Sequence, residues 1–266
     1  ETDKTARAIH RLVWNQDLVP FLVVTTPSTV RLYNGFALNR TEDRPLRHVA
    51  ADVSKALELL AAFSASAIDD GTVWWQWGEN VDPTQRANEM LLADLKELDH
   101  QLQTRGVARE VAHGLIGKFV YLRYLRDRGI LSDRKLVKWG VDANAVFSGH
   151  ATLKAFRTVN TQLQAELNGS VFKLGDDELD DLSQDQLRAV SGVFCGDSPS
   201  GQLHLDFSPY NFAHIPIETL YCVYEQFLHD TAKPDGTSRG KTLGAYYTPL
   251  PLADYVISEM ERKRPL

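Results

Sequence analysis

The spacing of apolar residues predicts two kinds of element at the start of the chain. Apolar residues recur at helical intervals between positions 4 and 14, so a short first helix is expected there. Two runs dense in β-branched residues follow, at 21–26 and 29–33, and Pro27-Ser28 separates them. We interpret the two runs as a β-hairpin that is closed by Asn34-Gly35.

The pattern remains mixed up to residue 83. Residues 50–66 show helical spacing, whereas residues 72–78 contain enough β-formers to be a possible strand. Together with the hairpin, these segments predict a small α/β region over residues 1–83, with a sheet only a few strands wide.

From about Thr84 onward the chain is predicted to be mainly helical, because apolar residues fall at three- and four-residue intervals. In the clearest helix, which is expected to stop near Gly129, one stripe contains Val111, Leu115, Phe119 and Leu122, and Ala112, Ile116 and Val120 widen it. Further helices are expected at 151–167, 185–193, 217–229 and 252–262, with a polar loop at 231–241.

These patterns predict an α+β fold with three parts. A small N-terminal α/β region is followed by a mainly α-helical connector domain over residues 84–230. Residues 231–266 then form a loop and the first helix of a further domain.

Composition narrows the class of protein. The chain has 266 residues, 43% of them hydrophobic, which is enough for one large core or two modest ones. No apolar stretch approaches the roughly 20 residues that cross a bilayer, and the start lacks a secretory signal. We therefore expect a soluble cytoplasmic protein with no membrane contact. The net charge of −6 disfavours tight nonspecific nucleic-acid binding, although it leaves room for a local basic patch.

No residue pattern predicts a metal site. Cys195 and Cys222 lack zinc spacing and are expected to be buried apolar residues, and the histidines show no HxxxH pair. The acidic cluster over residues 176–185 lacks the spacing of a calcium loop, so we interpret it as a solvated turn and helix start.

Aromatic and basic clusters admit two interpretations each. Trp74, Trp75 and Trp77 can form a stacking platform for bases, but core packing is favoured because large aromatic residues usually serve burial. The basic residues near the end of the 111–122 helix and in the 231–241 loop are interpreted as solvated charges, with phosphate contact as the alternative. They are Arg123, Arg126, Arg128, Arg239 and Lys241.

The sharpest local motif is Gly244-Ala245-Tyr246-Tyr247-Thr248-Pro249, which leads into the amphipathic stretch at 252–262. Gly244 permits close approach of the backbone, Thr248 suits a helix cap, and Pro249 suits a helix start. Taken alone, the motif also fits an ordinary loop-to-helix connection with two core tyrosines.

The order "IPIETLYCVYEQFL", polar loop, "GAYYTPLPLADYVI" resembles the start of the catalytic domain in adenine-specific DNA methyltransferases of type IIG restriction-modification enzymes and related phage-defence systems. Upstream, "LIGKFVYLRYLRDRGIL", "FRTVNTQLQAELNGSVF" and "LHLDFSPYNFAHIPIE" are similar to the helical region of that family. The resemblance covers roughly residues 107–260.

The resemblance implies transfer of a methyl group from S-adenosylmethionine to adenine in double-stranded DNA, with other defence-system subunits as possible partners. It makes Tyr246, Tyr247, Thr248 and Pro249 the cofactor-binding residues, and aromatic and hydroxyl groups suit such a ligand. The family's glycine-rich motif and its Asn/Asp-Pro-Pro-aromatic motif are absent from the 266 residues. No catalytic residue is therefore assigned, and this chain alone is expected to be inactive.

Two alternatives of other classes remain open. Related enzymes carry a metal-dependent nuclease whose carboxylates and lysine lie on strands, but the matching triplets here fall in helical or turn contexts: Asp94-Leu95-Lys96, Asp133-Arg134-Lys135 and Glu261-Arg262-Lys263. The hairpin nevertheless resembles the later strands of such nuclease domains. A noncatalytic module that docks DNA or partner subunits through the helical face is the second alternative.

Overall fold

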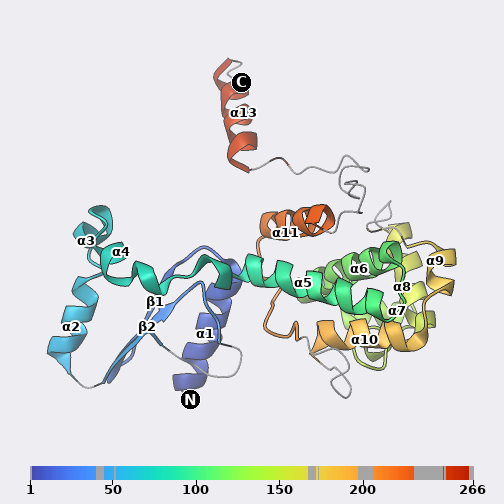
Figure 1. The fold of residues 1–266 in the computed structure, drawn as a ribbon, viewed down its shortest axis with the longest axis horizontal. Helices are drawn as coiled ribbons and strands as arrows, with labels where there is room; N and C mark the ends of the chain where they lie inside the picture. Colours follow the sequence, from blue (N-terminus) through green and yellow to red (C-terminus); the bar gives the residue numbers. More distant parts are fainter. Residues whose placement is uncertain are drawn as a thin grey trace.

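The structure is a computed structural model that describes residues 2–39, 45–50, 52–166, 172, 174–196, 206–230, 248 and 250–263. It confirms the expected α+β class. A three-stranded sheet with its own helices lies at one end of the molecule, and the longer helices gather toward the other end (Figure 1).

Helix α1, Thr2–Gln16, precedes an antiparallel sheet and confirms the first expected helix. The strands are β1, Phe21–Thr25; β2, Thr29–Asn34; and β3, Arg47–Ala50. They pair in the order β1-β2-β3, so β2 is the central strand.

The expected hairpin is confirmed, but Asn34-Gly35 does not close it. The turn lies at Pro27-Ser28, where Thr26 and Thr29 bond through backbone atoms and through their hydroxyls, both at 2.8 Å. Gly35 lies at the open end of the hairpin, and its N–H donates to Pro20 O at 2.8 Å. A Cβ on Gly35 would lie 1.9 Å from Val19 O, so this approach requires glycine.

Three short helices follow β3, where one long helix and a strand were expected. They are α2, Val53–Ala61; α3, Ala65–Asp69; and α4, Thr72–Trp77. The start of the expected 50–66 helix is wrong because Ala50 pairs in β3 and Asp52 caps α2, accepting from Lys55 N at 3.1 Å.

The expected strand at 72–78 is also wrong. Asp70 Oδ1 accepts from Thr72 N at 2.8 Å where α4 begins, and the helix buries Val73. A helix of six residues is too short to display a helical period in the sequence, so its aromatic residues mimic a strand.

A small hydrophobic core lies between the sheet and these helices. Its buried residues are Val30, Leu32, Val49 and Leu59, and Phe21, Val23, Leu46, Ala56, Phe63 and Trp77 pack against them. It forms a cluster separate from the main core.

Two 3₁₀ turns lead from the small region into the helical part. These turns are η1, Gly78–Asn80, and η2, Pro83–Gln85, and they precede α5, Ala87–Thr104. Helix α6, Arg109–Asp127, buries every member of the stripe that the sequence predicts. It stops before Gly129, whose φ of 72° is a left-handed conformation that favours glycine.

The main core is helical, and rings of Phe156, Phe119, Phe194 and Phe207 stack through it in that order.

None of the described helices is long and apolar enough to cross a bilayer. The expected loop at 231–241 lies outside the described residues. The remaining described elements are α7, Asp133–Lys138; η3, Ala143–Ala145; α8, Leu153–Glu166; α9, Asp176–Asp180; α10, Gln184–Cys195; α11, Ile217–Asp230; and α13, Leu250–Lys263. Helices α8, α10, α11 and α13 confirm the four later helices that the sequence predicts.

Candidate functional site

The predicted cofactor-binding residues lie largely outside the described residues. Tyr246, Tyr247 and Pro249 are not among them, and Thr248 is described and exposed. Thr248 precedes α13, so the helix expected after the GAYYTP segment is confirmed. The arrangement of the four residues around a ligand stays a prediction.

Helix α13 presents an uncovered apolar face. Polar contacts described for it lie within the helix, where Ser258 Oγ donates to Asp254 O at 2.7 Å and Arg262 pairs with Glu259 at 3.1 Å. Its exposed large apolar side chains are Leu252, Tyr255, Val256, Ile257 and Met260. An amphipathic helix with such a face suits packing against further protein.

Helix α11 is integrated into the helical core. Leu220, Val223 and Phe227 are buried, and Tyr224 Oη donates to His113 O at 3.3 Å. Helix α11 therefore anchors the chain to α5 and α6 before the GAYYTP segment.

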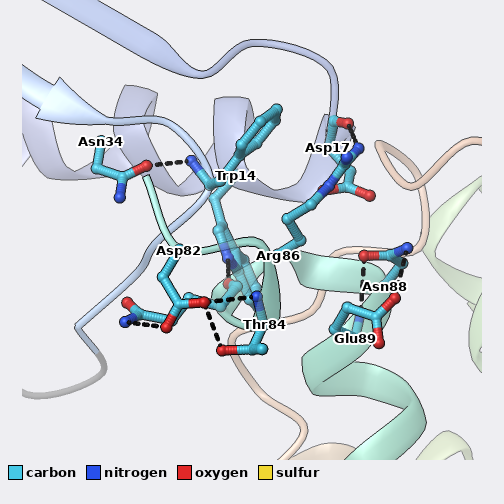
Figure 2. Close-up of polar contacts among 10 residues, drawn as sticks. Trp14, Asp17, Asn34, Asp82, Thr84, Arg86, Asn88 and Glu89 are labelled. Atoms are coloured by element: carbon cyan, nitrogen blue, oxygen red, sulfur yellow. Dashed lines mark hydrogen bonds and ion pairs between the residues drawn. The ribbon is translucent and has the colours of Figure 1, made fainter. Parts of the chain in front are cut away.

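A polar cluster joins the small α/β region to the helical part (Figure 2). Trp14 Nε1 donates to Gln85 O at 3.0 Å. Arg86 Nε donates to Asp17 Oδ1 at 3.0 Å, and Arg86 Nη2 donates to Asp17 O at 2.8 Å. The end of α1 thus holds the linker immediately before α5.

Asp17 is a buried acid in an unusual backbone conformation. Its φ is 57°, in the left-handed region. Burial raises the pKa of the Asp17 carboxyl above its ordinary value, and the hydrogen bond and charge of Arg86 act in the opposite direction. The Arg86 guanidinium also lies 4.4 Å from the ring centre of Phe36. These contacts describe a structural ion pair that joins two parts of the fold.

The sheet is tied to the same linker through Asn34. Asn34 Nδ2 donates to Asn80 O at 2.7 Å, and His10 Nε2 lies 2.8 Å from Asn34 O. Sequence reasoning missed this junction. Asp82-Pro83-Thr84 offers a local turn signal, since Asp82 Oδ1 accepts from Thr84 N at 2.9 Å, but the pairing of Asp17 with Arg86 leaves no local signal.

The segment that precedes α11 ties α1 to the helical core. Asn15 Nδ2 donates to Pro209 O at 3.1 Å, and Asn211 N donates to Asn15 Oδ1 at 2.7 Å. Tyr210 Oη donates to Asp94 Oδ2 at 2.7 Å. The described portion of "LHLDFSPYNFAHIPIE" is therefore a structural connection in this fold.

The three arginines near the end of α6 bind protein groups, so they are held more firmly than solvated charges. Arg239 and Lys241 lie outside the described residues. The partners are Asp127 and Phe194 O for Arg123, Asp133 and Leu131 O for Arg126, and Ile215 O for Arg128.

Buried ionisable groups lie on α5 and α6. His113 Nε2 is 3.4 Å from Asp99 Oδ1, and Gln103 Nε2 donates to Asp99 Oδ2 at 2.7 Å. Lys118 is also buried, and burial lowers its pKa to about 8. These groups lie in helices whose neighbouring side chains form the packed main core.

The nuclease-like triplets do not lie on strands. Asp94-Leu95-Lys96 is on α5, Asp133-Arg134-Lys135 on α7 and Glu261-Arg262-Lys263 on α13. The three strands carry no aspartate or glutamate. Within the part of the chain that the structure describes, no three His, Cys, Asp or Glu residues converge as a metal site.

Two expectations about burial are wrong. Cys222 is exposed and Cys195 half-buried, because they lie away from the apolar sides of α11 and α10. Trp75 is 90% exposed and Trp74 is 49% exposed, so core packing holds only for the third tryptophan, Trp77.

The sequence matches no known protein-family model and no curated protein, and the chain matches no solved structure.

Proposed function

We propose that the chain is the N-terminal and connector portion of an adenine-specific DNA methyltransferase of a restriction-modification or phage-defence system. The observation that carries the proposal is the ordered run of family-like segments ending in Tyr246-Tyr247-Thr248-Pro249. The proposal is supported by α6, α8 and α11, which supply the helical connector that the resemblance implies, and by α13 with its free apolar face.

The residues that would hold S-adenosylmethionine are Tyr246, Tyr247, Thr248 and Pro249. Thr248, the described member, fits such a role because it is exposed just before the first turn of a 14-residue helix. The tyrosines would offer ring faces to the adenine or the sulfonium, and Thr248 a hydroxyl to a polar group. When bound, the cofactor supplies the methyl group that becomes attached to the amino nitrogen of adenine.

The test uses the product of the whole reading frame, radiolabelled S-adenosylmethionine and double-stranded DNA. We expect label in adenine, and we expect Tyr247→Ala to weaken cofactor binding about tenfold, because loss of one aromatic contact costs about 1–3 kcal/mol. Tyr221→Ala is the matched control, since Tyr221 is an exposed tyrosine on α11. It should leave binding unchanged.

The alternatives give different results in the same assay. Absence of cofactor binding by the whole protein would refute the proposal. Divalent-metal-dependent cleavage without methylation would favour the endonuclease. Salt-sensitive DNA binding without either reaction would favour a noncatalytic docking module.

A further inference from the structure

Helices α2, α3 and α4 expose large apolar side chains that the fold does not cover. On α2, Val53, Leu57 and Leu60 follow one another at intervals of four and three residues, so they share one face. Ala56 and Leu59, on the adjoining side of α2, already pack in the small core against the sheet. The apolar part of α2 is therefore wider than the part that the sheet covers, and the remainder is free to pack against another protein.

The next two helices extend this exposure. Ile68 on α3 is exposed, and Trp74 and Trp75 on α4 add two large rings. Trp74 contacts Phe21 at 5.4 Å between ring centres, whereas Trp75 stands almost entirely in solvent. All three helices lie at the end of the molecule farthest from the helical part (Figure 1). We call Val53, Leu57, Leu60, Ile68, Trp74 and Trp75 the α2–α4 surface.

The stretch of chain that carries the α2–α4 surface is acidic. Between residues 52 and 82, Lys55 is the one basic residue, and it is paired with Asp52 at 3.4 Å. Arg47 is the nearest cation before this stretch, and it lies on β3. The acidic residues are Asp52, Glu58, Asp69, Asp70, Glu79 and Asp82.

From this combination we infer that the α2–α4 surface docks an amphipathic helix of a partner protein, whose apolar face is flanked by lysine or arginine. Apolar anchors supply the contact area, and charges of opposite sign at the rim set its specificity. The inference is independent of methyl transfer.

The same charges argue against other occupants. Nucleic acid and anionic lipid surfaces carry negative charge, which the acidic residues repel. A symmetric dimer would place the acidic rim of one copy against the same rim of the other. Helix α13 is a poor match because Asp254, Glu259 and Glu261 accompany its apolar face.

The experiment measures binding of a labelled synthetic amphipathic helix of leucine and lysine by fluorescence anisotropy, with the whole protein. We expect Leu57→Ser/Trp75→Ala to weaken binding about tenfold or more. Glu58→Lys/Asp69→Lys should weaken it as well, because it reverses charge at the rim. The matched control is Leu252→Ser/Tyr255→Ala on α13, which removes an exposed leucine and an exposed aromatic ring elsewhere and should leave binding unchanged.

Several results would overturn the inference. These are no binding of the leucine-lysine helix, equal binding of a leucine-glutamate helix, or equal weakening by the α13 control. Loss of single-stranded DNA binding in Trp75→Ala would instead show a stacking platform, and loss of self-association in that variant would show an interface between copies. Circular dichroism and unfolding midpoints establish that each variant is folded.

Discussion

Trp14→Ala is expected to lower the free energy of unfolding by about 4 kcal/mol, because it removes a fully buried ring and leaves a cavity. Trp14 is 2% exposed and packs in the main core, with its ring centre 5.3 Å from that of Tyr210. It also donates to Gln85 O in the linker. Urea unfolding followed by circular dichroism measures the change.

Two variants separate the contributions at this position. Trp14→Phe keeps an aromatic ring and loses the bond to Gln85 O, so a smaller cost of about 1–2 kcal/mol is expected. Trp75→Ala makes the same chemical deletion at an exposed position and should change stability by less than about 0.5 kcal/mol. Equal losses from Trp14→Ala and Trp75→Ala would contradict the assignment of Trp14 to the core.

The contrast between these tryptophans shows where sequence reasoning succeeds. Long helices such as α6 repeat their apolar spacing over several turns, so the buried positions follow from the period. Helix α4 has a single buried valine, and nothing in "TVWWQW" distinguishes its inner side from its outer side. Burial of Trp14 and exposure of Trp75 depend on tertiary contacts that the local sequence does not encode.

The starts of the short helices α2 and α3 could have been predicted in part from their capping residues in the sequence. Asp52 and Ser64 accept hydrogen bonds at the starts of α2 and α3, and a search for N-caps would have divided the expected 50–66 helix. The junction between Asp17 and Arg86 was not recoverable in this way, because it is a contact between the end of one helix and the start of another. The predicted cofactor-binding residues, Tyr246 to Pro249, rest on the sequence motif alone, since three of the four lie outside the described ranges.

Arg86→Met is expected to lower the free energy of unfolding by about 2 kcal/mol at neutral pH, because it leaves the Asp17 carboxylate buried without its cation. Complete loss of a buried partner costs about 3–5 kcal/mol. A smaller loss is expected here because water screens the pair: the Arg86 side chain is 35% exposed, whereas that of Asp17 is 5% exposed. Methionine retains an apolar side chain over Phe36.

The loss should depend on pH in a defined direction. The pKa of Asp17 is raised in the folded protein, chiefly by burial, and removal of Arg86 raises it further because Arg86 lowers it. The folded state then binds the proton more tightly than the unfolded chain, so the contribution of this group falls as pH rises through the folded pKa. The deficit of Arg86→Met relative to wild type should therefore shrink on acidification from about pH 7 toward about pH 5.

Asp17→Asn provides the control that identifies the carboxylate as the cause. Asparagine tolerates a positive φ and retains an oxygen that accepts from Arg86. Starting from Asp17→Asn, the further change Arg86→Met should cost less than it does in the wild type, and its cost should not vary over the same pH range. The coupling energy from this double-mutant cycle measures the ion pair. If instead Arg86→Met costs the same in both backgrounds and at both pH values, Arg86 acts through its packing on Phe36 and its bond to Asp17 O, and the buried charge does not determine the stability of the junction.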